Sequence, residues 1–216
     1  MMDAPSLSFY SGTARARTLR DKRYRNMASL LDSLMEQLNG TGAAAQLAGR
    51  LGVDEGRASG AMASAIPAIL AGLANNTAKP KGAAALNEAL GQHDGSVFDD
   101  AGTYFADDRQ PADGDKILGH VFGAKKGAVE GQVAALSGLN AGQGAQLMAM
   151  LAPLIMGFLG KQKSSGGMDA SALSKLLGAQ SGDLGKLLQG PLGDMLLGGG
   201  KSGGLGGMLG KLLGRR

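Results

Sequence analysis

The sequence repeats itself at a spacing of 86 residues, and this repeat limits the possible fold more than any other feature. Residues 46–73 align with residues 132–159 without a gap, and 9 of the 28 aligned pairs are identical. Only about 3 identities are expected by chance in a chain so rich in alanine, glycine and leucine. A duplicated unit that buries its apolar face against its twin explains this pattern. We therefore expect two related helical units that share one core.

The first copy predicts a short helix, a glycine turn and a longer helix. An alanine-rich helix over 43–51 is expected to end at Gly52. Asp54 is a good N-cap for a helix over 55–73, because its carboxylate accepts a hydrogen bond from the first turn. Asn140 has the same place before the long helix of the second copy. The pattern predicts an all-α fold, and no segment reads convincingly as a strand.

Each long helix contains a proline at the matching position. Pro67 lies in the first and Pro153 in the second, which is expected to run over 141–159. A proline inside a helix removes one backbone hydrogen bond and favours a kink. A hinge or groove is one interpretation. We favour a bend that fits the two copies together.

Further helices are expected outside the repeat. Leucines at helical spacing predict a helix over 27–38, and short helices are expected over 83–90 and 116–122, the last capped by Asp115. Residues 94–115 are expected to form a solvated acidic loop, because the spacing of a calcium loop is absent. The other acidic residues of that segment are Asp99, Asp100, Asp107, Asp108 and Asp113.

Charge divides the chain into three parts. Residues 1–26 have a net charge of +4, residues 27–159 of −5 and residues 160–216 of +5. Glycine is concentrated after residue 160, which is typical of a mobile, low-complexity tail. We therefore expect a helical domain over 27–160, a flexible basic extension before it, and a flexible tail over 161–216.

The basic N-terminal stretch has three interpretations. It lacks the apolar run of a secretory signal. Met27 opens the first helical pattern, so it is a candidate for the true start of the protein. A disordered basic arm and a targeting segment are the alternatives. The sequence contains no cysteine, which excludes disulfides and fits a cytoplasmic location.

The sequence offers no convincing catalytic, cofactor or metal site. Its two histidines are His93 and His120, and neither has a second histidine or a cysteine at ligand spacing. His120 lies in a helical pattern and is expected to be a buried or half-exposed structural residue. The glycines match no phosphate-binding loop. We expect no metal and no cofactor.

Two apolar features are open to more than one interpretation. The run over 147–159 is shorter than a membrane span, so a central buried helix is preferred to a partner-binding face or membrane insertion. The tail contains three Leu-x-x-Leu-Leu turns, over 173–177, 184–188 and 209–213. Each turn has lysine at its third position, namely Lys175, Lys186 and Lys211. Such turns either lie on an anionic membrane or in a partner groove, or they cover part of the domain.

Nucleic-acid binding is not expected. Residues 46–54 faintly resemble the first helix and turn of a helix-turn-helix motif. The helix that would read the bases begins with acidic residues and glycine, and the middle of the chain is net negative. Both features oppose contact with phosphates.

Three segments together resemble a known family. The residues over 27–34, 65–70 and 116–123 are similar, in order and spacing, to the YidB-like family of bacterial domains of unknown function (domain-of-unknown-function family 937). The resemblance covers about 27–160. It implies a multihelical domain and a bacterial source. Because the family has no established activity, the resemblance supplies no catalytic residues.

The sequence therefore favours a non-enzymatic module for protein interaction or scaffolding, with an unknown partner or with itself. Met-rich helices suit adaptable binding surfaces. One alternative is a protein that associates with an anionic membrane surface through its Leu/Lys-rich tail. The other alternative is an enzyme that uses His120 or the carboxylates of 94–115, which requires those groups to meet in one cleft.

Overall fold

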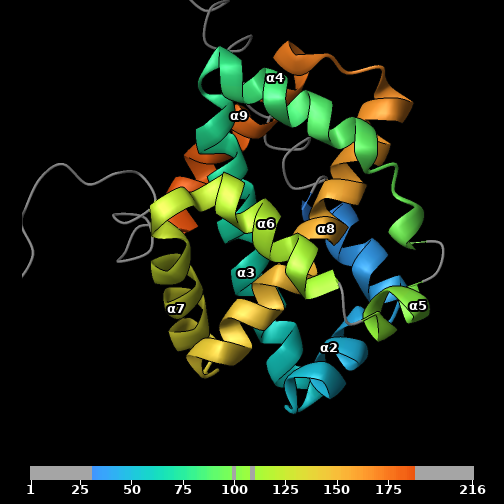
Figure 1. Ribbon diagram of the computed structural model, residues 1–216, viewed down its shortest axis with the longest axis vertical. Helices are drawn as coiled ribbons and strands as arrows, with labels where there is room; N and C mark the ends of the chain where they lie inside the picture. Colours follow the sequence, from blue (N-terminus) through green and yellow to red (C-terminus); the bar gives the residue numbers. More distant parts are fainter. Residues whose placement is uncertain (1–30, 99–100, 108–109, 188–216) are drawn as a thin grey trace, which may run out of the picture.

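The computed structural model describes residues 31–98, 101–107 and 110–187, which form an all-α domain (Figure 1). These ranges contain no β-strand, so the predicted fold class is confirmed for them. Residues 31–40 form the helix expected near the start of the domain. The expected extension over 1–26 and the last turn, over 209–213, lie outside the described residues.

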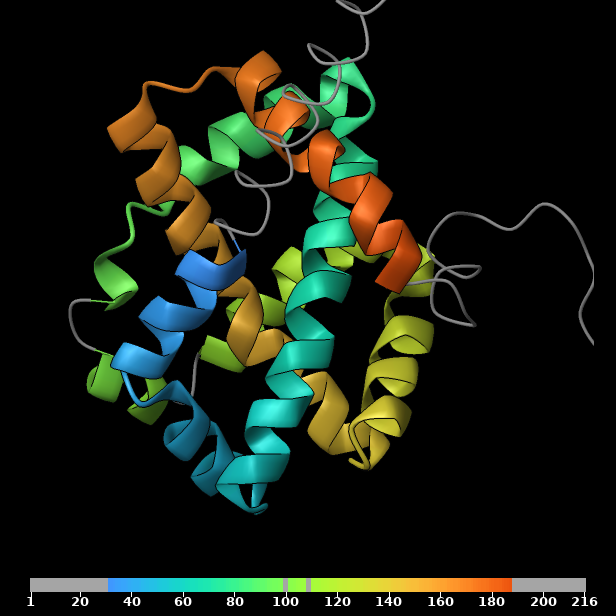
Figure 2. The same cartoon turned by 180° about the vertical axis from the view of Figure 1, so that it is seen from behind.

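Two long helices run through the middle of the domain, α3 (Glu55–Thr77) and α8 (Ala141–Gly166) (Figures 1 and 2). They contact each other, and the other helices pack around them. All residues of α8 over 147–160 are buried, so the apolar run is a central core helix as predicted. Most of the large, fully buried side chains come from these two helices: Met62, Ile66, Ile69, Leu70, Leu147, Met148 and Met150.

Both prolines lie inside the core helices. α3 continues past Pro67 and α8 past Pro153, so neither proline ends its helix. The two rings are buried, and they fill apolar space that a hinge would have to open. Burial favours the packing interpretation of the two prolines over the hinge.

The two sequence copies have the same local structure. In the first, α2 (Ala43–Leu51) ends at Gly52; in the second, α7 (Lys126–Leu136) is followed by Gly138. These two glycines, 86 residues apart, have φ angles of 66° and 63°. This left-handed conformation is one that glycine adopts without steric cost. A common local structure agrees with duplication, and the duplication itself stays a prediction.

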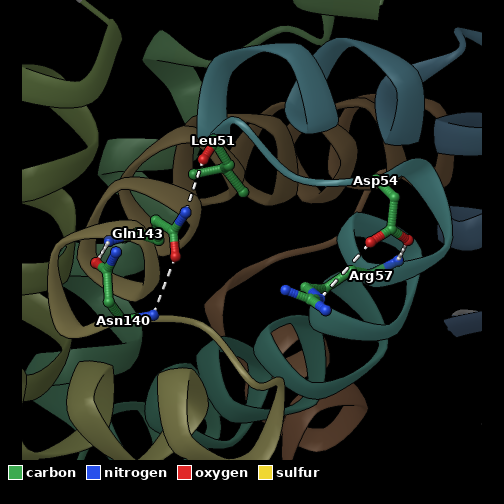
Figure 3. Close-up of polar contacts among 5 residues, drawn as sticks. All are labelled: Leu51, Asp54, Arg57, Asn140 and Gln143. Carbon is green, nitrogen blue, oxygen red and sulfur yellow. Dashed lines mark hydrogen bonds and ion pairs between the residues drawn. The ribbon is translucent and has the colours of Figure 1, made fainter.

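The predicted N-caps of the two long helices are confirmed (Figure 3). In addition, the side chain of Gln143 connects the start of α8 to the end of α2. Asp54 accepts a hydrogen bond from the Arg57 backbone N–H at 2.8 Å. Asn140 accepts one from the Gln143 N–H at 2.9 Å, and the Gln143 side-chain oxygen accepts one from the Asn140 N–H at 3.0 Å. The Gln143 side-chain nitrogen also donates to the Leu51 carbonyl at 2.8 Å, which ties the start of α8 to the end of α2 (Figure 3).

We expect Gln143→Ala to lower the free energy of unfolding by about 1–2 kcal/mol, because it removes two side-chain hydrogen bonds. Gln146→Ala, one turn further along α8, is the matched control. Gln146 is also half-buried and takes no part in the cap, so its replacement should change stability by less than about 0.5 kcal/mol. Urea unfolding followed by circular dichroism compares the two. Equal losses would mean that the cap contributes nothing.

The helix expected over 83–90 is longer at its start. It is α4 (Pro80–Ala89), followed by the short 3-10 helix η1 (Leu90–Gln92). Proline is favoured in the first turn because its fixed φ suits a helix and its missing N–H needs no partner there. A second short 3-10 helix, η2 (Ser96–Phe98), follows.

The prediction of a solvated loop over 94–115 is wrong, because this segment contains helices. One is α5 (Ala101–Ala106), whose Tyr104 and Phe105 are buried against the core. Their rings meet edge to face, with centroids 5.1 Å apart. The Tyr104 hydroxyl donates to the Met150 carbonyl at 2.5 Å, and burial raises the pKa of this phenol. The aromatic side chains therefore hold a segment whose acidic residues suggested a loop.

The predicted cap at Asp115 is also wrong. The helix that contains it, α6 (Gln110–Phe122), begins earlier, with Pro111 in its first turn. Asp115 instead forms an ion pair with Lys126, which also lies 3.7 Å from the carboxylate of Glu130. The Asp115 carboxylate raises the pKa of Lys126, whereas burial raises the pKa of Glu130. Asp115 thus links α6 to α7.

The helical body extends past residue 160, the boundary expected from the sequence. α8 continues to Gly166, and α9 (Ala170–Leu187) lies along α3 and α4 (Figure 2). Leu173 and Leu177, from the first Leu-x-x-Leu-Leu turn, are 0% exposed, and the Ser174 hydroxyl donates to the Thr77 carbonyl at 2.9 Å. This turn covers the domain, which was one of its predicted roles.

Candidate binding cleft

A cleft of about 670 Å³ opens between the end of α3, α4 and α6. Ligand-binding pockets in proteins have volumes of roughly 300–1,000 Å³ and mostly apolar linings. The cleft joins segments that lie far apart in the sequence. Its lining consists of Leu73, Asn76, Lys79, Lys81, Gly82, Ala85, Leu86, Ala89, Gln92, His93, Ile117, His120, Val121 and Met156.

The floor of the cleft is apolar. Leu73, Leu86, Val121 and Met156 line it and are themselves buried in the core. They come from α3, α4, α6 and α8, so the floor is held by four helices. Ala85 is exposed on the α4 wall, where its small side chain leaves the cleft open. An apolar group that entered the cleft would be removed from water at little structural cost.

A pair of hydrogen bonds shapes one end of the cleft. The side-chain nitrogen of Asn76, near the end of α3, donates to the carbonyl of Val121 at 3.0 Å and to that of His120 at 3.3 Å. These bonds satisfy carbonyls at the end of α6, where a helix leaves acceptors without partners. Gly82 packs against the Asn76 backbone, so a side chain there would collide with it. Asn76 thus fixes α3, α4 and α6 around the opening.

The polar rim of the cleft is cationic. Lys79 and Lys81, at the start of α4, are exposed. In the part of the chain that the structure describes, neither lysine has an ion-pair partner. The lining contains no aspartate and no glutamate. Complementarity therefore favours a negatively charged group at this rim.

A second, smaller pocket of about 330 Å³ adjoins His93. Its lining includes the carboxylates of Asp94, Asp107 and Asp113, from the acidic segment. The Asp94 carboxylate accepts a hydrogen bond from the Ser96 N–H at 2.9 Å, and this bond lowers the pKa of Asp94. The structure thus gathers these carboxylates beside a histidine, which residue spacing did not indicate. Asp99, Asp100 and Asp108 lie outside the described residues.

Both histidines line the larger cleft, and the sequence did not predict this. His120 lies on its rim and is exposed rather than buried. His93 lines both pockets and is half-buried. Among the described residues, neither imidazole ring forms a hydrogen bond with another side chain. No group of three or more histidine and acidic side chains within those ranges is arranged to hold a metal ion.

The stability of the protein should fall on acidification because of His93. Burial lowers the pKa of His93, against the opposing effect of Asp113 and Asp94. The unfolded chain therefore takes up the proton at a higher pH than the folded one, so the neutral imidazole stabilises the fold above the ordinary histidine pKa of about 6.5. This contribution is lost as the pH falls through the folded-state value. We expect His93→Asn to flatten the decline in urea stability between about pH 8 and 5.

The Asp113→Asn variant provides an internal check on this prediction. Removing the carboxylate removes a charge that raises the pKa of His93. The NMR titration of the His93 ring should therefore move to lower pH, and the decline in stability should become steeper. The same change made together with His93→Asn should not alter the decline. A steeper decline in that double variant would assign the effect to another group.

Two helices pass a test of length and composition for membrane spans. They are α3 and α8, and most of the apolar stretch in each is buried inside the domain. The core helix of a water-soluble protein passes the same test, so this observation is weak evidence for a membrane.

The comparison with known families gives one match. A family model described as "Bacterial protein of unknown function (DUF937)" matches residues 32–162. No curated protein and no solved structure matches the chain. The matched range includes all of the residues that line the cleft.

Proposed function

The chain belongs to the DUF937 family of bacterial proteins of unknown function, and on that premise we propose that it is a non-enzymatic protein-interaction module of the bacterial cytoplasm. The cleft between α3, α4 and α6 is its binding site. One observation carries the proposal: an open cleft of about 670 Å³ combines a buried apolar floor with polar groups at its rim. Clefts between helices commonly receive apolar side chains of a partner helix.

The lining supports binding rather than catalysis. Aliphatic side chains make the floor, and amide, ammonium and imidazole groups make the rim. Acid–base or nucleophilic catalysis requires a nucleophile or proton donor held within hydrogen-bond reach of a base. The carboxylates that adjoin His93 lie in the smaller pocket, whose lining contains only His93 and Gln92 in common with the cleft. The cleft can therefore hold an apolar group and orient it by its polar rim.

The rest of the surface makes the cleft the best candidate. Among the side chains whose burial the structure describes, Leu136 is the one large apolar group that is broadly exposed. A partner that buries apolar surface therefore finds it in the cleft. The first Leu-x-x-Leu-Leu turn already uses Leu173 and Leu177 for packing, so it supplies no exposed leucine face for a membrane.

The proposal is tested by photo-crosslinking in the native bacterium. A leucine-sized photoreactive residue with an aliphatic diazirine, which leaves most of the cleft free, is placed at position 85, and the matched control carries it at position 84. Both alanines are exposed on α4, but only Ala85 lines the cleft. We expect an adduct with one defined protein from position 85 alone, and mass spectrometry distinguishes another protein from a second copy. No adduct, or the same adduct from both positions, would contradict the proposal.

A further inference from the structure

We propose that the natural occupant of the cleft is an amphipathic helix of a partner protein that carries carboxylates beside its apolar face. This inference rests on the proposed function and names the chemistry of the partner. The apolar floor would receive the anchoring side chains. Lys79 and Lys81 would pair with the carboxylates at the edge of the helix.

Helices form the walls of the cleft. α4 and α6 lie on two sides of it, and Leu73, Leu86 and Met156 contribute to its apolar floor. A helix that binds in a groove inserts apolar side chains spaced three or four residues apart and keeps its polar flank at the rim. At the rim, Lys79, Lys81 and His120 are exposed, so they can reach residues on the flank of a bound helix.

The positive charge at the rim of the cleft favours a partner helix with an acidic flank. Other described lysines on α6 and α7 are already paired, Lys116 with Asp113 and Lys126 with Asp115. Lys79 and Lys81 have no such partner in the described structure, and the lining contains no carboxylate. Lys79 is the N-cap of α4 and Lys81 lies in its first turn, and this end of the helix adds a partial positive charge. An acidic flank neutralises this edge, whereas a basic one is repelled.

The test uses the full-length protein and a displayed library of helical peptides with randomised surface positions. We expect the selected peptides to share apolar residues at helical spacing and to be enriched in aspartate and glutamate. The affinity of a selected peptide, measured by fluorescence anisotropy, should fall at least about tenfold in the Lys79→Glu, Lys81→Glu double variant. The affinity of the peptide for the unchanged protein should also fall as the salt concentration is raised.

A matched control separates a local effect from net charge. Lys125→Glu with Lys175→Glu makes the same change in net charge at exposed lysines outside the cleft lining. This variant should change the affinity by less than about twofold, because neither lysine lines the cleft and salt screens charges outside it. Circular dichroism confirms that both double variants are folded. Equal losses in the two variants would overturn the inference.

The Ala85→Trp variant separates failure of the inference from failure of the proposed function. Tryptophan at this position would project a large side chain from the lining and obstruct the cleft, whereas position 84 lies outside the lining. Peptides that lose affinity with Ala85→Trp, but are neither acidic nor weakened by charge reversal, would overturn the inference and leave the proposed function standing. If no selected peptide distinguishes Ala85→Trp from Ala84→Trp, both are overturned.

A small amphiphile is the remaining competitor for the cleft. Sodium dodecanoate carries the same apolar and anionic groups as the proposed helix. If dodecanoate shifts the NMR signals of cleft residues and no selected peptide does, the occupant is a small molecule and the inference is overturned. Shifts by the acidic peptides, which the Lys79→Glu, Lys81→Glu variant weakens, support it.

Discussion

Replacement of Gly114 by alanine will lower the free energy of unfolding by about 3 kcal/mol, because overpacking at a close helix contact is costly. Gly114 lies within α6, where that helix crosses α8. A β-carbon at this position would overlap the carbonyl oxygen of Ala149. A backbone carbonyl cannot change rotamer to relieve the overlap, as a flexible side chain can, so α6 and α8 must move apart.

The matched control for this prediction lies on the same helix. Gly119 is exposed, and a β-carbon there would meet no atom within 4 Å. Gly119→Ala should therefore raise the stability by about 0.5–1 kcal/mol, the usual gain from replacing a helical glycine. Urea unfolding followed by circular dichroism measures both variants. A stable Gly114→Ala protein would show that α6 and α8 do not cross as closely as described.

The Leu177→Ala variant will be destabilised by about 2–4 kcal/mol, the range for leucine-to-alanine changes at fully buried sites. Leu177 is 0% exposed where α9 packs on α3 and α4. Its neighbour Leu176 is only half-buried, so Leu176→Ala should cost about 1 kcal/mol. Urea unfolding compares the two. Similar small losses would mean that α9 is not part of the cooperative core.

Local chemistry made the helix caps and the glycine turn predictable. Asp54 and Asn140 act on the backbone within three residues, and Gly52 supplies a left-handed turn that few other residues adopt. These features depend on neighbours in the sequence, so their positions were identified correctly. The bond from Gln143 to Leu51 spans 92 residues of sequence, and no local pattern reveals it.

The acidic segment was misread because its packing is not local. Asp107 and Asp113 suggested a solvated loop, but Tyr104 and Phe105 are buried against distant residues such as Met150. Burial of two aromatic side chains outweighs the preference of nearby aspartates for water. The helix α9 was missed for a similar reason. Its segment is rich in glycine and was read as a low-complexity tail, but its leucines pack against α3, which lies far away in the sequence.

The cleft was beyond sequence reasoning. Lys79 and His120 are 41 positions apart, and the floor adds Met156 from a third region of the chain. Taken alone, the sequence around each of these residues did not indicate a binding site. Only the arrangement of α3, α4 and α6 brings a cationic edge to an apolar floor. Sequence patterns indicate which helices form, whereas their crossing decides which side chains meet.

The position of α9 affects how the protein is made. α3 emerges from the ribosome long before α9, which later covers one of its apolar sides. Until residues 170–187 have been synthesised, that side of α3 is open to water or to other nascent chains. Chaperones that bind apolar segments during translation therefore have a binding site on this nascent chain. Messenger RNAs truncated before the α9 codons should yield polypeptides that aggregate.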